Sequence, residues 1–296
     1  MTTGFLYDFL HGVASGDPDE EGAVLWTRIS HRFSPSVQSR RVRWTVYRDE
    51  DLADVLATGI ATASADSDWT CKVVVTGLAA STKYRYRFAA SEGDGPSLSP
   101  MGTFKTLPAP GAHVERMRYA AFSCSNYGWG YFNAYNHAAK NLDLDFWLHL
   151  GDYYYEYGAE HHPSRSEAVR SIGLEPQHEC LTLEDYRKRH ATYRADPDLQ
   201  DLSASAAAIT IWDDHEVANN QWGTHDASGT WHGGAENHDP KTEGSFLQRK
   251  RAAIQAYHEW LPTRTAAFGE KGYVGERYFR KFHFGDLADL LILETR

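Results

Sequence analysis

The sequence of 296 residues is poor in cysteine, lacks a long hydrophobic run and has no excess of positive charge. Its three cysteines are an odd and sparse set, which argues against a disulfide framework. No apolar run is long enough for a membrane span, and the composition is that of a globular soluble protein. The net charge of −10 argues against a protein that binds nucleic-acid backbones, but it leaves phosphate substrates open because bound cations reverse the local sign.

The first residues show no pattern of an export signal. Met1 is followed by TTGFLYDFL, without a basic region or a cleavage site. We therefore expect either a cytoplasmic protein or a mature or trimmed form of an exported one. The sequence has no internal repeats, and its length suits one large domain or two ordinary ones.

In the first third of the chain, from about residue 10 to residue 107, apolar and polar residues alternate with a period of two. VRWTVYR places Val42, Trp44 and Val46 on one face, and KYRYRF alternates aromatic with basic residues in the same way. Short alternating strands separated by turn signals predict an antiparallel β-sandwich.

The segment TLPAPGAH at 106–113 is the best domain boundary, because prolines and a glycine interrupt regular structure. Strand and helix patterns alternate after it, which predicts a layered α/β arrangement. Buried strands are expected at MRYAAFSC, DFWLHLG and AAITIW, and helices at YFNAYNHAAKN, residues 182–196 and SFLQRKRAAIQAYHEWLP. The polar residues 219–244 are expected to be a long loop that is either functional or disordered.

Each of the three expected strands ends on a residue type that binds metal ions. The first ends at Cys124, the second at Asp152, and the third at Asp213, Asp214 and His215. Sites of open α/β sheets lie outside the carboxyl ends of the strands. One such acid alone is either a turn residue or a helix N-cap, and Cys124 alone is most often a small buried hydrophobe. Three such strand ends together favour a metal site, because a cation removes the repulsion between adjacent aspartates.

Residues around Asp152 extend this prediction. Gly151 lets the backbone turn sharply, so that the carboxylate comes close to the ion. Tyr155 lies three residues after Asp152 and can reach the same ion. A thiolate together with a phenolate suits ferric iron better than magnesium. The other tyrosines of this run, Tyr153, Tyr154 and Tyr157, are expected to be packing residues.

Five motifs, taken together, resemble the PhoD-like alkaline phosphatase and phosphodiesterase family: HGVASGDP, VLWTR, FSCSN, GDYYYEYG and WDDHEVANN. The resemblance implies an α+β/α/β fold. A fibronectin-like β-sandwich at 5–107 would precede a metallophosphatase-type α/β/β/α core at 114–296, incomplete at its C-terminus. It also implies a periplasmic or secreted enzyme.

The resemblance further implies a site that holds one ferric ion and calcium. The implied metal ligands are Cys124 as thiolate, Asp152 as bridging carboxylate, Tyr155 as phenolate, and Asp214, with Asp213 either supporting it or binding directly. His215 would lie beside the leaving-group oxygen as the catalytic residue. Asn219 and Asn220 would contact the second metal or the phosphate of the substrate.

The activity expected from this resemblance is metal-dependent hydrolysis of small phosphate mono- and diesters, with hydroxide formed at neutral pH through the paired cations. One alternative is a phospholipase D-like or nucleotide phosphodiesterase, and another is an inactive truncated member that acts as a binding module. The sequence departs from the family in lacking a twin-arginine leader, in carrying Glu294 in ADLLILETR, and in lacking a later Gly-Asp-x-His segment. We therefore expect this chain, expressed alone, to be poorly soluble or nearly inactive.

Overall fold

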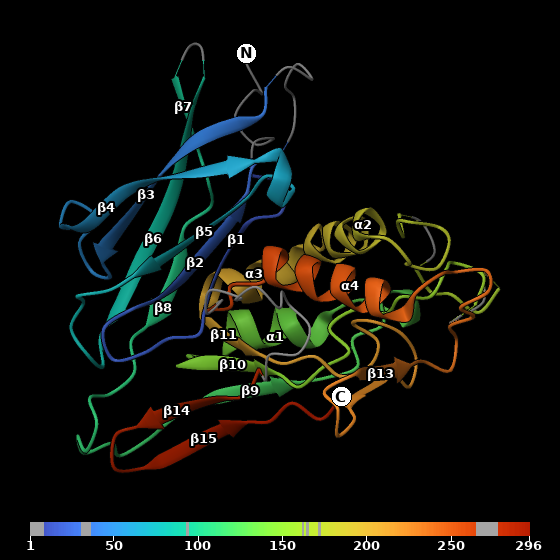
Figure 1. Ribbon diagram of the computed structural model, residues 1–296. Coiled ribbons are helices and arrows are strands. Elements are labelled where there is room, and N and C mark those ends of the chain that lie inside the picture. The colour runs from blue at the N-terminus through green and yellow to red at the C-terminus, as the bar shows by residue number, and fades with distance from the viewer. Residues whose placement is uncertain are drawn as a thin grey trace.

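The computed structural model describes residues 9–30, 37–92, 95–161, 163, 166–170, 173–264 and 278–296. A six-stranded sheet with the order β5-β2-β1-β11-β10-β9 crosses the molecule, and a five-stranded sheet is built from β4, β3, β6, β7 and β8 (Figure 1). The expected sandwich and the expected α/β region are both present.

The N-terminal strands are β1 (Val13–Gly16), β2 (Ala23–Arg28), β3 (Ser39–Arg48), β4 (Val55–Ser64), β5 (Thr70–Val75), β6 (Lys83–Glu92), β7 (Gly95–Leu98) and β8 (Gly102–Lys105). The predicted alternation is confirmed, since Val42 and Val46 of β3 and Tyr86 and Phe88 of β6 are fully buried. These side chains pack with apolar residues of β1 and β2 in one cluster, so the two sheets share a core.

One sheet of the sandwich continues into the second half of the chain. β1 pairs in parallel with β11, with Gly16 opposite Ala208. A Cβ atom at Gly16 would lie 2.5 Å from the carbonyl oxygen of Pro262 and 2.8 Å from that of Ala208, so this close approach requires glycine. The limits 5–107 and 114–296 remain a prediction, because the sheet is continuous across the two parts.

The second half contains three parallel strands, β9 (Tyr119–Phe122), β10 (Phe146–His149) and β11 (Ala207–Thr210). Its helices are α1 (Asn133–Asn141), α2 (Leu183–Arg194), α3 (Pro197–Ser205) and α4 (Phe246–Trp260). The three expected helices correspond to α1, α2 and α4. The sequence reading missed α3, although Asp196 caps it and Pro197 occupies its first turn.

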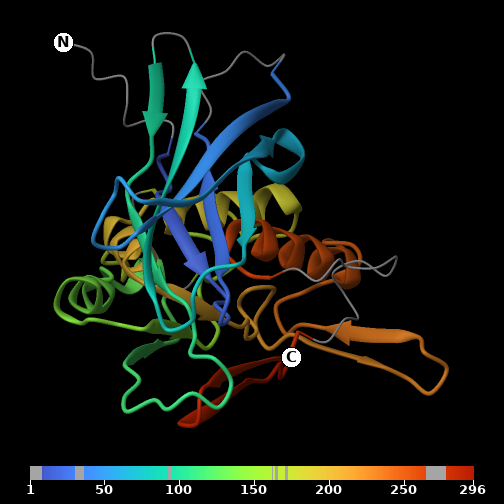
Figure 2. The same ribbon diagram turned by 90° about the vertical axis from the view of Figure 1, so that its left-hand side faces the viewer.

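The two faces of the parallel strands are covered differently (Figures 1 and 2). On one face, Phe122 of β9 contacts Tyr135 of α1, with ring centroids 4.8 Å apart. On the other, Phe146 of β10 stacks on Phe284 of β14, at 4.9 Å. The strands β14 (Arg280–Phe284) and β15 (Ala288–Ile292) form an antiparallel hairpin. The parallel strands therefore lie between the helices and this hairpin.

Two expectations for the second half were wrong. β9 is not a buried strand: within the described part of the chain it pairs only with β10, and Tyr119 is 49% exposed. Residues 219–244 are not a loop throughout, because β12 (Trp222–His225) and β13 (Trp231–Gly234) form a hairpin within them. The ring of Trp231 occupies the space beside Gly223 and Gly233, where an added Cβ atom would lie 3.1 Å and 2.3 Å from it. The polarity of the segment alone did not reveal this pairing.

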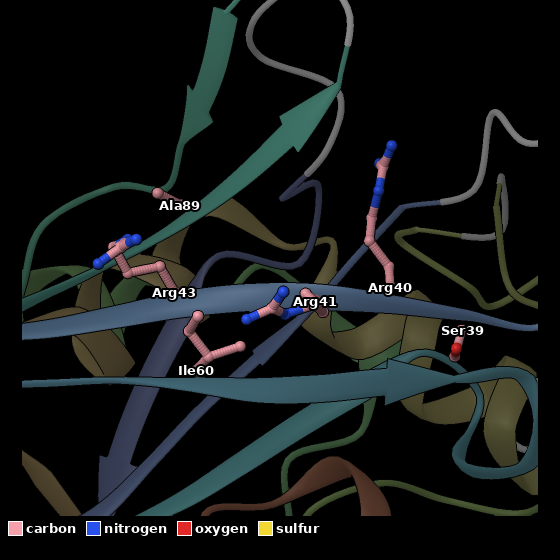
Figure 3. Close-up of a pocket in the computed structure, with 6 residues that line it drawn as sticks. All are labelled: Ser39, Arg40, Arg41, Arg43, Ile60 and Ala89. Atoms are coloured by element: carbon pink, nitrogen blue, oxygen red, sulfur yellow. The ribbon is translucent and has the colours of Figure 1, made fainter.

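The outer surface of the N-terminal sheet carries a cavity of about 470 Å³. It is lined by residues of β3, β4 and β6, namely Ser39, Arg40, Arg41, Arg43, Ile60 and Ala89 (Figure 3). None of the metal-ligand candidates lines it. No helix among the described residues has the length and apolar character needed to cross a membrane.

Candidate metal centre

The carboxyl ends of the three parallel strands meet at one edge, as the sequence predicts. Asp152, Asp214 and His215 each offer a ligand atom, and these atoms all lie within 4.8 Å of one another. The Sγ atom of Cys124 lies 3.4 Å from Oδ2 of Asp152. The backbone N–H of Cys124 donates to the carbonyl oxygen of Gly151 at 3.2 Å, which joins the segments that follow β9 and β10.

The turn after β10 depends on Gly151. Its φ is 107°, and a Cβ atom there would lie 2.4 Å from Cβ and 2.5 Å from the backbone nitrogen of Asp213. No larger residue fits between these two strand ends. Asp152 and Cys124 also have positive φ values, 52° and 56°, which cost free energy for residues other than glycine. Strained residues of this kind often occur at functional sites.

Tyr155 turns toward the same carboxylate. Its hydroxyl donates to Oδ2 of Asp152 at 3.2 Å, and its ring centroid lies 4.2 Å from that of His215. Cys124 is exposed, whereas Cys71 and Cys180 are buried, so Cys124 is not a small buried hydrophobe. Thiol, phenol and carboxyl groups therefore converge on Asp152.

The electrostatics of these groups fit a bound cation. Burial, followed by the charge of Asp152, raises the pKa of Tyr155. Burial raises the pKa of Cys124, with Asp152 adding to it. The pKa of Asp152 is itself raised, first by burial and also by the charge of Asp214. These donors disfavour one another's anionic forms, and a cation among them would favour those forms.

Asp213 is not among the three residues whose ligand atoms converge. It accepts hydrogen bonds from Arg296 at 2.5 Å and 3.2 Å, and this guanidinium lowers the pKa of Asp213. Arg296 also donates to Oδ1 of Asp214 at 3.2 Å. Arg296 therefore pairs with both aspartates, and whether Asp213 supports Asp214 or binds a metal directly stays a prediction.

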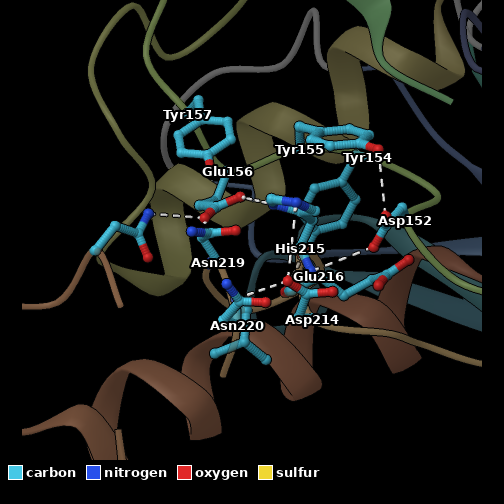
Figure 4. A network of polar contacts seen from close by, with 12 residues as sticks. Asp152, Tyr154, Tyr155, Glu156, Tyr157, Asp214, His215, Glu216, Asn219 and Asn220 are labelled. Atoms are coloured by element: carbon cyan, nitrogen blue, oxygen red, sulfur yellow. Dashed lines mark hydrogen bonds and ion pairs between the residues drawn. The ribbon is translucent and has the colours of Figure 1, made fainter. Parts of the chain in front are cut away.

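His215 is held by a buried glutamate that the sequence reading missed. Its Nδ1 lies 2.8 Å from Oε2 of Glu156, a residue with no exposed surface (Figure 4). Its Nε2 lies 3.8 Å from Oδ2 of Asp214. Burial by itself lowers the pKa of His215, but Glu156, Asp152 and Asp214 outweigh burial, so the pKa is raised.

Glu156 also orders the chain after His215. Its Oε1 accepts hydrogen bonds from the backbone N–H of Asn219 at 2.6 Å and from the amide of Asn237 at 2.8 Å. The backbone N–H of Asn220 donates to Oδ2 of Asp214 at 2.7 Å. The side-chain amides of Asn219 and Asn220 both donate to Glu236, at 3.1 Å and 2.5 Å. These side-chain amides lie beside the carboxyl ends of β9, β10 and β11, which we call the metal edge, without contacting the carboxylates there.

A second buried glutamate, Glu216, joins the ends of β10 and β11. It accepts hydrogen bonds from the backbone N–H groups of Tyr153 at 2.5 Å and Asp213 at 2.8 Å. Burial raises the pKa of Glu216 to about 8. Both glutamates lie inside the quoted motifs, Glu156 in GDYYYEYG and Glu216 in WDDHEVANN. Tyr153 and Tyr154 are buried packing residues, as expected.

The fold and this donor set define an α/β protein with a candidate metal site, whose parallel sheet extends into a β-sandwich. The family described as "PhoD-like phosphatase" matches residues 119–296, and its N-terminal domain matches residues 5–108. The chain belongs to the PhoD-like phosphatase family.

Known proteins support this assignment. Alkaline phosphatase D of Bacillus subtilis (strain 168) is 37% identical over 294 residues, covering 98% of this chain and 47% of that protein. A solved structure of PhoD is 36% identical with a TM-score of 0.82, covering 98% of this chain and 52% of that one. A purple acid phosphatase, PPD1 of yellow lupin seeds, shares the fold alone, with 11% identity, a TM-score of 0.51 and coverage of 92% and 42%. The chain spans about half the length of the relatives it matches.

Proposed function

We propose that the protein hydrolyses phosphate mono- and diesters at the metal edge formed by the ends of β9, β10 and β11. The observation that supports this most is the convergence of Asp152, Asp214 and His215 within 4.8 Å, with Cys124 and Tyr155 beside them. Membership of the PhoD-like phosphatase family supports the reaction class. Export to the periplasm or secretion is part of the same proposal.

The metal ions of the proposal are ferric iron and calcium. Cys124 and Tyr155 would hold the iron, because thiolate and phenolate suit a ferric ion, and Asp152 would face both ions. Asp214 would be a further ligand, and carboxylate oxygens suit calcium. Bound ions of this kind neutralise charge on a phosphate ester and lower the pKa of water.

The remaining roles belong to side chains near these donors. Glu156 orients the His215 ring through Nδ1. Nε2 is then the atom that donates a proton to the leaving-group oxygen. Asn219 and Asn220 would bind the substrate phosphate by exchanging their hydrogen bonds to Glu236 for phosphate oxygens. Asp213 would stay paired with Arg296 and hold the strand end in place.

The proposal is tested with Asp152→Asn in the whole protein, because the amide keeps the shape of the side chain and removes its charge. Release of phosphate from p-nitrophenyl phosphate and of p-nitrophenol from bis-p-nitrophenyl phosphate should fall about a thousandfold or more. Asp201→Asn, an exposed carboxylate on α3, is the matched control and should keep full activity. A wild-type protein that binds phosphate but cleaves neither ester would instead support a binding module.

A further inference from the structure

We propose that a cavity beside the metal edge binds the alcohol group of the phosphate ester and favours alcohols that carry a planar ring. The cavity has a volume of about 440 Å³, and Cys124, Tyr155, Trp129, Tyr131 and Phe132 are among its lining residues. We call it the aromatic cavity. The inference rests on the proposed hydrolysis of phosphate esters and adds a substrate class to it.

The aromatic cavity is continuous with the candidate metal centre. Cys124 and Tyr155 line the cavity and also lie 3.4 Å and 3.2 Å from Oδ2 of Asp152. A phosphate group placed at these donors has its ester oxygen within reach of the cavity. The group bonded to that oxygen is therefore the part of the substrate that enters it.

The chemistry of the cavity wall indicates an uncharged, flat ligand. No arginine, lysine, aspartate or glutamate is among its lining residues. This differs from the cavity on the N-terminal sheet, which three arginines line (Figure 3). A second phosphate group thus has no cationic partner in the aromatic cavity, whereas a ring can stack on aromatic side chains there.

Two aromatic side chains of this wall are open to solvent. Trp129 is 48% exposed and Tyr131 is 64% exposed, and they are separated only by Gly130. Phe132, the next residue, is buried and packs against Tyr135 and Tyr193, at 5.0 Å and 5.8 Å between ring centroids. The wall is therefore anchored in the core through Phe132, while Trp129 and Tyr131 keep about half or more of their surface exposed at the cavity.

Arg170 fixes the position of this wall. Its guanidinium carbon lies 3.7 Å from the ring centroid of Tyr127, 4.7 Å from that of Phe132 and 5.1 Å from that of Tyr131. The same guanidinium pairs with Asp196, the buried N-cap residue of α3. Rings held in this way lose little conformational freedom when a ligand stacks on them.

The test compares benzyl phosphate with n-propyl phosphate in the whole protein. The two alcohols are of similar acidity, so the chemical step is matched and the ring is the main difference. Trp129→Ala and Tyr131→Ala should each lower kcat/KM for benzyl phosphate about tenfold and leave that for propyl phosphate within about twofold. Trp129→Phe and Tyr131→Phe should restore most of the preference, and inhibition by inorganic phosphate should not change.

Tyr119→Ala is the control, because this ring is similarly exposed but lies at the opposite end of β9 from Cys124. The ratio between the two substrates is taken within one preparation, so a partly misfolded variant does not distort it. Equal losses on both esters, or no loss on either, would overturn the aromatic cavity as a subsite for the alcohol. If the wild-type protein cleaves neither ester, the proposed hydrolysis itself fails, and the subsite fails with it.

Discussion

The N-terminal sandwich and the metal edge bury opposite kinds of side chain. In the sandwich, Val46 and Phe88 are fully buried in an apolar cluster between two sheets. At the metal edge, the fully buried side chains include the carboxyl groups of Glu156 and Glu216. The first region is stabilised by removing apolar surface from water, and the second by hydrogen bonds from backbone N–H groups to buried carboxyl groups.

Because of this difference, we expect substitutions in the two regions to have different effects on stability and on activity. A smaller side chain in the sandwich leaves a cavity and costs stability without changing chemistry. A neutral side chain at the metal edge keeps its volume but weakens the negative field that would hold cations and that orients His215. The predictions below separate these two effects.

The largest effect is expected from Asp214→Asn. This substitution removes a charge from the donor set while the backbone N–H of Asn220 keeps an oxygen acceptor. Hydrolysis of p-nitrophenyl phosphate should fall about a thousandfold, which corresponds to about 4 kcal/mol. The midpoint of urea unfolding in chelator should shift little, because no apolar packing is lost. A variant that retains both its metal and its activity would remove Asp214 from the donor set.

Phe88→Ala should show the reverse pattern. The ring is fully buried in the sandwich core, so its loss should destabilise the protein by about 3–5 kcal/mol. Activity per folded molecule and metal content should stay close to wild type at low temperature. Urea unfolding and a metal assay on the same sample measure both quantities. A large loss of metal in the folded variant would mean that the two regions are not independent.

Glu156→Gln should have an intermediate effect. The amide keeps the shape of the buried side chain but replaces a charged partner of His215 with a neutral one. Partners of this kind typically change metal affinity or activity by about 10–100-fold. The pH profile of kcat/KM should shift to lower pH, because Glu156 raises the pKa of His215. An unchanged profile would show that Glu156 does not act through His215. Glu160→Gln, four residues further along, is a suitable control.

The smallest effect is expected from His190, a buried histidine in the core. His190 is fully buried, its ring nitrogens have no hydrogen-bond partner among the described residues, and burial lowers its pKa to about 3. Below a pH of about 6.5, the unfolded chain binds a proton that the folded protein does not. Stability should therefore fall as pH decreases from about 6.5 toward 3, by at most about 1.4 kcal/mol per pH unit from this group.

His190→Phe should make this pH dependence shallower, because the phenyl ring can stack on Trp260 as the imidazole does. The free energy of unfolding in urea at pH 7 and pH 5 provides the comparison. Parallel curves for the wild type and the variant would contradict the buried neutral histidine.

The sequence predicted the fold well where the signal is local, since alternation identified the sandwich strands. The residues after three strand patterns also predicted that Cys124, Asp152 and Asp214 lie together at one edge, while their role as metal donors stays a prediction. The sequence did not reveal that β1 joins β11, since pairing between distant segments leaves no periodic pattern. It also missed the roles of Glu156 and Glu216, because a carboxylate that binds backbone N–H groups reads in sequence as one more acidic residue.

The direction in which a side chain points was the other feature that the sequence did not predict. The adjacent aspartates in WDDHE look alike in the sequence, yet Asp214 offers a ligand atom close to those of Asp152 and His215, whereas Asp213 is not in that group. The close approach of Gly151 to Asp213, where a Cβ atom on the glycine would lie 2.4 Å from Cβ of the aspartate, also leaves no pattern in the sequence.

The central claim, that thiol, phenol and carboxylates at this edge hold metal ions, is tested most directly by the metal content and visible spectrum of the purified whole protein. We expect stoichiometric iron together with calcium, and a charge-transfer band that bleaches or shifts in Tyr155→Phe. Tyr157→Phe, a half-buried ring two residues away, should leave the band unchanged. Protein without bound metal, or a Tyr155→Phe spectrum identical to that of the wild type, would contradict the account.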